Sequence, residues 1–226
     1  NSFDIWLTLS SLGGKIKLEV PLKNSSHFRE MHQNGKLKSG IRLSKTMATF
    51  MFEVCDVPTK SAGEIIGLDI GINKVFVTSD GQLSKPDNHD HTLNSIIAKI
   101  CRKTKGAKAF KRAIDHRKNY INWSLNRLNL RNTKQVNVEN IFNLRKNKRI
   151  SRQLSHWTYT NIYDKLGRLC EENGVRLNRV NQAYTSQKCS SCGNTDKKNR
   201  IKESFACNFC GYKSDADFNA SLNLRS

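Results

Sequence analysis

Four cysteines near the end of the chain constrain its fold more than any other feature. Cys189 and Cys192 form one Cys-x2-Cys pair, fourteen residues follow, and Cys207 and Cys210 form a second pair. A two-residue gap lets both thiolates of a pair reach one ion, and two pairs complete a tetrahedral set of sulfur ligands for Zn²⁺. The spacing predicts one structural zinc ion in a ribbon over residues 186–212. Because all four positions are thiolates, we expect no open coordination position for catalysis there.

Disulfides or a redox pair are the alternatives for these four thiols. The first residues lack the basic start and continuous apolar core of a secretory signal, and no run of about 18 apolar residues could span a membrane. We therefore expect no membrane partner and a cytoplasmic protein, associated with the nucleoid, whose thiols stay reduced. This expectation favours zinc over disulfides. Of the other three cysteines, Cys170 lies in an apolar helical pattern and is expected to be buried.

Apolar periodicity divides the rest of the chain. Residues 1–58 alternate apolar and polar side chains, which predicts a β-rich segment with hairpin turns at Gly13-Gly14 and Asn34-Gly35. After a linker rich in Pro and Gly, the pattern becomes that of an α/β domain. Its expected elements are strands over 65–70 and 74–79, a helix from Leu93 to about Leu130, a strand over Gln135–Ile141, a helix over Ser151–Asn173, a strand over Val175–Val180 and a final helix beginning near Asp217.

The charge is strongly unbalanced. The chain has 39 Lys and Arg against 19 Asp and Glu, a net charge of +20, which indicates a polyanionic partner such as nucleic acid. Between Lys99 and Arg149 there are sixteen basic residues and two acids, whereas a merely solvated helix face usually mixes both signs. The residues expected to contact phosphates are Arg102, Lys103, Lys105, Lys108, Lys111, Arg112, Arg117, Arg145, Lys146, Lys148 and Arg149. Tyr120, Trp123 and Trp157 are expected to be core or groove-wall residues.

Three acids stand at the ends of predicted elements. Asp69 lies in an apolar strand, Glu139 closes a strand in the most basic region, and Asp217 opens the last helix. If they converge at one edge of the sheet, their oxygens suit Mg²⁺ or Mn²⁺. The alternatives are structural: a satisfied buried acid at Asp69, a salt bridge from Glu139 to Arg145 or Lys146, and a helix cap at Asp217. The residues by themselves leave both interpretations open.

Five sequence blocks resemble a known family. The blocks are "GLDIGINKVFVTSDG", "VNVENI", "AYTSQKCSSCGNTDKK", "FACNFCGY" and "DADFNASLNL". Together they resemble the RuvC-type nuclease of transposon-encoded TnpB (OrfB) proteins and of their relatives, the compact type V CRISPR effector nucleases. The resemblance covers roughly Ile65 to the end and implies an α/β fold. This fold is an RNase H-like (RuvC) mixed sheet with flanking helices, an inserted zinc ribbon and an N-terminal β-rich, wedge-like segment.

The resemblance also implies an activity, RNA-guided DNA endonuclease, with guide RNA and target DNA as partners. It makes Asp69, Glu139 and Asp217 the catalytic ligands of two Mg²⁺ or Mn²⁺ ions that hydrolyse phosphodiester bonds. Asp215 is the rival for the third position. The same resemblance makes Cys189, Cys192, Cys207 and Cys210 the ligands of the single structural zinc.

The family pattern suggests four segments: 1–58 as an incomplete wedge (oligonucleotide-binding) segment, 64–185 as the RuvC-like core, 186–212 as the zinc ribbon and 213–226 as the final RuvC helix. The first part of the wedge and the helical recognition lobe of the family are missing from these 226 residues. We therefore expect either a homodimer or a missing N-terminal recognition portion. Two alternative functions remain: a nuclease-inactive, guide-dependent DNA-binding repressor or accessory protein, and a basic zinc-ribbon RNA-binding protein.

Overall fold

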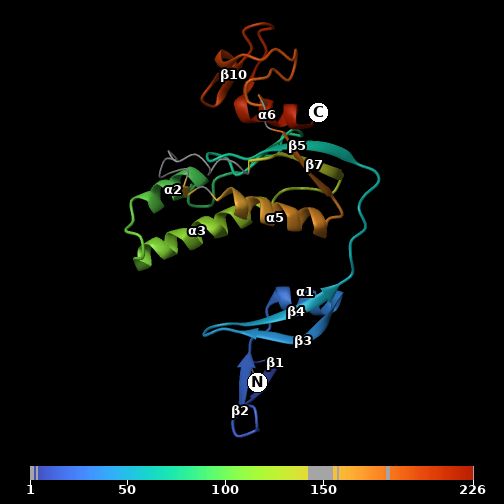
Figure 1. Ribbon diagram of the computed structural model, residues 1–226, viewed down its shortest axis with the longest axis vertical. Helices are drawn as coiled ribbons and strands as arrows, with labels where there is room; N and C mark the ends of the chain where they lie inside the picture. Colours follow the sequence, from blue (N-terminus) through green and yellow to red (C-terminus); the bar gives the residue numbers. More distant parts are fainter. Residues whose placement is uncertain (1–2, 4, 142–154, 157, 182–183, 226) are drawn as a thin grey trace. The chain divides into compact units, whose positions relative to one another are not determined.

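The computed structural model describes residues 3, 5–141, 155–156, 158–181 and 184–225 (Figure 1). They form two compact units, Asn1–Asp56 and Val57–Ser226, which are described separately. None of the helices within these ranges is both long and apolar enough to cross a membrane.

The first unit consists of two antiparallel hairpins and one helix. β1 (Ile5–Ser10) pairs with β2 (Lys17–Leu22), and β3 (Gly35–Leu43) pairs with β4 (Ala48–Val54). The predicted turn at Gly13-Gly14 is confirmed, because both glycines have positive φ angles between β1 and β2.

The prediction of a hairpin turn at Asn34-Gly35 is wrong. These residues join α1 (Ser26–Asn34) to β3, so a helix interrupts the expected β pattern. The Ser25 side chain caps this helix by accepting a hydrogen bond from the Phe28 N–H at 3.1 Å. The Phe28 ring then packs edge-on against Phe50 and Phe52 of β4, each with ring centroids 5.3 Å apart. The cap and this aromatic packing favour the helix over a strand.

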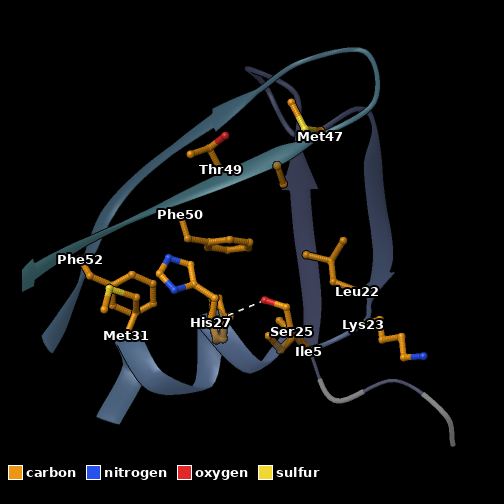
Figure 2. A pocket seen from close by; sticks show the side chains of 12 residues that line it. Ile5, Leu22, Lys23, Ser25, His27, Met31, Met47, Thr49, Phe50 and Phe52 are labelled. Atoms are coloured by element: carbon orange, nitrogen blue, oxygen red, sulfur yellow. Dashed lines mark hydrogen bonds between the residues drawn. The ribbon is translucent and has the colours of Figure 1, made fainter. Parts of the chain in front are cut away.

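A pocket of about 490 Å³ lies within this unit (Figure 2). Met31 of α1 and Phe50 and Phe52 of β4 line it, together with Ile5 and Leu22 of the first hairpin. Its walls are therefore mainly apolar.

The second unit is built on a four-stranded mixed sheet with the order β6-β5-β7-β8. β5 (Glu64–Asp69) is central, pairs antiparallel with β6 (Val77–Thr78) and pairs parallel with β7 (Thr133–Glu139), which in turn pairs parallel with β8 (Arg176–Val180). The predicted strands and the α/β mixed-sheet class are confirmed. Because β5, β7 and β8 run in parallel, their carboxyl ends share one edge, where ligands of open α/β sheets bind.

Helices cover both faces of this sheet. Figure 1 shows α2 (Leu93–Cys101), α3 (Lys108–Leu125) and α5 (Tyr159–Glu172) on one side and α6 (Ala216–Arg225) on the other.

The prediction of a single helix over Leu93–Leu130 is wrong, since α2 ends before a six-residue connection in which Gly106 has φ +91°. Gly106 lies within this connection, where its left-handed backbone conformation is one that glycine adopts readily. The core between these helices and the sheet contains Leu68, Ile97, Ile121, Val138, Ile162 and Cys170, among other buried side chains.

Gly67 explains how α6 crosses β5. A Cβ atom at this position would lie 1.9 Å from the Ser221 carbonyl oxygen and 2.5 Å from the Arg225 nitrogen. These distances are far shorter than any van der Waals contact, so only glycine lets the helix backbone approach the strand this closely.

The region between β8 and α6 is a small three-stranded sheet with the order β11-β10-β9. Its strands are β9 (Arg200–Ile201), β10 (Ser204–Ala206) and β11 (Lys213–Asp215), preceded by the 3-10 helix η2 (Lys197–Asn199). Cys207 and Cys210 lie in the turn between β10 and β11, whereas Cys189 and Cys192 lie before η2 in a turn closed by the Lys188–Thr195 bridge; β11 leads directly into α6.

Candidate active site and cysteine cluster

The structure brings the three predicted acids to one pocket. Asp69 ends β5 and Glu139 ends β7, and the parallel register that pairs Leu68 with Val138 places both acids at the same edge of the sheet. Asp217 lies in the first turn of α6, which packs across β5. All three side chains line a pocket of about 430 Å³.

Electrostatics in this pocket disfavour three bare carboxylates. Burial, followed by the nearby carboxylates of Asp217 and Glu139, raises the pKa of Asp69 from 3.8 to about 7. Burial also raises the pKa of Glu139. A bound divalent cation would offset both the burial and the repulsion, so the donor set suits a hard cation such as Mg²⁺ or Mn²⁺.

Two cations of the site were not identified from the sequence. The Arg200 Nη2 donates a hydrogen bond to the Asp217 Oδ1 at 2.9 Å, and Arg200 lines the same pocket. The Lys74 Nζ lies 3.9 Å from the Asp217 Oδ2 and 2.7 Å from the Asp215 Oδ2. Lys74 lies in the same sequence block as Asp69, but no spacing pattern marks either Lys74 or Arg200, because each reaches Asp217 only through the fold.

The carboxylate oxygens of Asp69, Glu139 and Asp217 do not all lie within 4.8 Å of one another. Among the described residues, the groups of three or more ligand atoms that all lie within 4.8 Å of one another are the four cysteines and the set Asp87, His91 and His116. Mg²⁺ binds oxygens at about 2.0–2.1 Å, so oxygens on one ion lie at most about 4.2 Å apart. One ion held by Asp69, Glu139 and Asp217 together therefore requires their oxygens to move closer than they are here.

Asp215, the rival third acid, has a different position. Its Oδ1 accepts hydrogen bonds from the backbone N–H groups of Asp217 and Phe218, each at 3.1 Å, so it caps α6. Burial alone would raise the pKa of Asp215, but the hydrogen bond from Lys74 and those backbone donors hold it below its usual value. Asp215 is not among the described residues that line the pocket of Asp69. The geometry thus favours Asp217 as the third acid.

The four cysteines form one cluster. The Sγ atoms of Cys189 and Cys210 are 3.7 Å apart, and those of Cys192 and Cys207 are 3.6 Å apart. A disulfide needs about 2.05 Å between sulfurs, so these thiols are free. Tetrahedral zinc with Zn–S bonds of about 2.3 Å places its sulfurs about 3.8 Å apart, close to the observed distances. The residues therefore fit a structural zinc ion.

Two asparagine side chains of α6, the helix that carries Asp217, bind the cysteine region to this helix. Asn219 is fully buried; its Oδ1 accepts from the Ser190 N–H at 3.0 Å and its Nδ2 donates to the Lys188 carbonyl at 2.8 Å. One turn later, the Asn223 Nδ2 donates to the same carbonyl at 2.7 Å. Sequence reasoning missed this role, although two asparagines four residues apart on one helix face were a usable signal.

The predicted basic surface is present in part. Arg117 departs from the prediction: only 6% of it is exposed, and its guanidinium donates a hydrogen bond to the His156 carbonyl, so it holds α3 in place instead of facing phosphate. Tyr120 is buried, in agreement with a core role, and Arg127 covers the Trp123 ring at 3.7 Å. The residues that are exposed or partly exposed are Arg102, Lys103, Lys105, Lys108, Lys111 and Arg112, around the connection between α2 and α3. Arg145, Lys146, Lys148, Arg149 and Trp157 lie outside the described residues.

Comparisons with known proteins agree with the resemblance seen in the sequence. A family model described as "Cas12f1-like, TNB domain" matches residues 159–224. "CRISPR-associated endodeoxyribonuclease Cas12f1" from Sulfoacidibacillus thermotolerans is 44% identical over 75 residues, which are 33% of this chain and 18% of that protein. A Streptomyces pristinaespiralis protein, whose name proposes an RNA-guided DNA endonuclease, is 25% identical over 202 residues, 81% of this chain and 50% of that protein.

Among solved structures, a chain of the "Cryo-EM structure of the Cas12f1-sgRNA-target DNA complex" is similar with a TM-score of 0.49 and 18% identity. The match covers 84% of this chain and 64% of that one. The aligned part of this chain spans half or less of the length of the two curated relatives.

Proposed function

Because the chain is a relative of the TnpB-like compact type V effectors, we propose that it is an RNA-guided DNA endonuclease or its catalytic half. The observation that carries the proposal is the meeting of Asp69, Glu139 and Asp217 in one pocket from three separate elements. A buried acid such as Asp69, whose pKa is raised to about 7, is costly to keep for packing alone. The relatives named as endonucleases supply the reaction class.

In this proposal, Asp69, Glu139 and Asp217 hold two Mg²⁺ or Mn²⁺ ions. Two such ions supply the charge that activates a water for attack on phosphorus and stabilises the departing 3′ oxygen. The carboxylates orient this centre and must be ionised to do so. Arg200 and Lys74 add positive charge beside Asp217, where they can contact phosphate oxygens of the substrate strand. With no ions bound, the same two cations neutralise Asp217.

The remaining parts have supporting roles. The second unit is proposed to be a RuvC-like, RNase H-like core over 64–185, and the ribbon over 186–212 is proposed to hold one zinc ion through its four cysteines. The segment 213–226 is its final helix. Asn219 joins the ribbon to this helix and so fixes the position of Asp217. The hairpins of residues 1–58 are proposed to be part of a wedge segment.

Guide RNA and target DNA are the proposed partners. The support is the net charge of +20 and the exposed basic residues around the α2–α3 connection. A DNA target would place the protein at the nucleoid. The part of the relatives that this chain does not cover could supply target recognition.

The test begins with the RNA that copurifies with the tag-free chain. This RNA is sequenced, and a duplex DNA matching its variable segment is incubated with the complex and Mg²⁺. A short single-stranded DNA serves as a second substrate, because it needs no target recognition. We expect a defined, structured RNA and metal-dependent cutting that falls at least about 10³-fold in Asp69→Asn, since one ligand contributes several kcal/mol.

Glu139→Gln and Asp217→Asn should lose cutting to a similar degree. Asp164→Asn is the matched control, because Asp164 is an exposed acid of α5 away from the pocket. Cutting by Asp69→Asn at the wild-type rate would overturn the catalytic assignment. Random cellular RNA in the purified protein would overturn the guided function.

A second candidate is a guide-dependent DNA-binding repressor or accessory protein that does not cut. The Arg200–Asp217 ion pair at 2.9 Å favours it, because a paired Asp217 is less available to a metal. In the same assay, RNA-directed DNA binding with no cutting by the wild type in Mg²⁺ or Mn²⁺ would select this candidate over the nuclease.

A further inference from the structure

Three side chains outside the acid pocket converge on one point. The ligand atoms of Asp87, His91 and His116 all lie within 4.8 Å of one another. The Asp87 Oδ2 is 3.1 Å from the His91 Nδ1 and 3.7 Å from the His116 Nε2. The two imidazole rings are nearly perpendicular, with centroids 4.9 Å apart. Neither the cysteine cluster nor the acid pocket includes any of these residues.

Two separate segments build this cluster. Asp87 and His91 lie in the turn before α2, and His116 lies in the middle of α3. The turn is closed by hydrogen bonds: the Asp87 N–H donates to the His91 carbonyl at 3.1 Å, and the Asp87 Oδ1 accepts from the backbone N–H groups of His89 and His91 at 2.9 and 3.0 Å. These bonds fix one carboxylate oxygen and leave the Oδ2 beside the two imidazoles. Such outer support for a ligand is characteristic of built metal sites.

The distances suit a metal better than a hydrogen-bonded pair alone. The distance of 3.7 Å from the His116 Nε2 to the carboxylate exceeds the range for an N–H···O hydrogen bond, which ends near 3.2 Å. A tetrahedral ion with bonds of about 2.0–2.1 Å to nitrogen and oxygen places neighbouring ligands about 3.3–3.4 Å apart. The observed 3.1 and 3.7 Å lie on either side of this value. Two imidazoles and one carboxylate select a transition metal over Mg²⁺, which prefers oxygen ligands.

We propose that Asp87, His91 and His116 form a second site for a divalent transition metal such as Zn²⁺, separate from the cysteine cluster. Three protein ligands leave a coordination position for water or an external group. The ion can enter from solvent, because the Asp87, His91 and His116 side chains are 18, 35 and 30% exposed. The site ties the turn before α2 to α3, and it is independent of the proposed nuclease function.

The location gives the site a role. His91 also lines a pocket of about 410 Å³ with Lys99, Arg102 and Lys103 of α2 and the residues that follow it. A metal bound at His91 would therefore order the edge of this basic pocket.

The experiment counts zinc in the full, tag-free chain. Wild type and variants are dialysed against micromolar free Zn²⁺, and bound metal is measured by mass spectrometry. We expect two equivalents in wild type and one in His116→Ala and in His91→Gln, with an affinity loss at the second site of at least about 100-fold. His89→Ala is the matched control, because His89 lies in the same turn and its ring neighbours His91, but its ligand atoms do not belong to the cluster. It should keep two equivalents.

One equivalent in the wild type that His116→Ala and His91→Gln both retain would overturn the proposal, as would two equivalents in both variants. If His116→Ala does not fold, His91→Gln gives the answer, because His91 lies in an exposed turn outside the helices. Loss of nuclease activity has no bearing on these counts, so the two proposals fail independently.

Discussion

Replacing Asp69 with asparagine should stabilise the metal-free protein at alkaline pH although it removes a proposed metal ligand. The reason is the environment of this carboxyl: burial first, and then the carboxylates of Asp217 and Glu139, raise its pKa from 3.8 to about 7. A raised pKa means that the folded state holds the charged form less well than the unfolded state does. An asparagine has nearly the same shape and no charge to bury.

The sign and the size follow from proton linkage. Below about pH 4 the carboxyl is protonated in both states and contributes nothing; as the pH rises from about 4 to about 7, the folded state keeps the proton longer, so the free energy of unfolding falls. Above about pH 7 the loss is constant. With 1.36 kcal/mol for each tenfold change, a pKa moved from 3.8 to about 7 corresponds to a loss of about 4 kcal/mol at pH 8 and about 2 kcal/mol at pH 5. The stability gained by Asp69→Asn should therefore grow by about 2–3 kcal/mol between these pH values.

Urea denaturation in Mg²⁺-free buffer containing zinc measures this gain. A Trp6→Phe background removes the single tryptophan of the first unit, so fluorescence reports on the second unit through the remaining tryptophans. Asp164→Asn is the control and should show no growth with pH, because Asp164 is exposed. Millimolar Mg²⁺ should stabilise the wild type at pH 8 and not Asp69→Asn. A gain that is equal at pH 5 and pH 8, or a less stable variant at pH 8, would refute the reasoning.

Two further substitutions test how α6 is held. Gly67→Ala should destabilise the second unit by about 1–3 kcal/mol or more in urea denaturation, because the new Cβ enters the backbone of α6. Gly167→Ala is its control, since the nearest atom is 4.0 Å away and alanine favours a helix by up to about 1 kcal/mol; equal effects of the two would contradict the packing argument. Asn219→Ala should cost about 1–3 kcal/mol, because it leaves the partly buried Ser190 N–H without its acceptor and removes one of the two donors to the Lys188 carbonyl, and a variant as stable as wild type would disprove that role.

The sequence alone determined the features that depend on short spacing or on regular periodicity. The two Cys-x2-Cys pairs predicted the four-sulfur cluster, because ligands two residues apart can reach one ion in almost any local fold. The strands of the mixed sheet were predicted because buried strands are encoded by local apolar runs. Asp69 was identified because it is a charged residue within such a run and Glu139 because it closes another, and parallel strands end at a common edge.

Only the tertiary structure decided which side chains meet across long stretches of chain. Arg200 and Lys74 approach Asp217 through the packing of the ribbon, β5 and α6, and no local pattern marks them. Arg117 was expected at the surface, but this side chain of α3 is buried. Its guanidinium donates a hydrogen bond to the His156 carbonyl and does not face solvent. His116 joins Asp87 and His91 in the same way, since the packing of α3 against the turn before α2 sets their separation. Periodicity tells which face of an element is buried, whereas partners across the fold depend on how the elements pack.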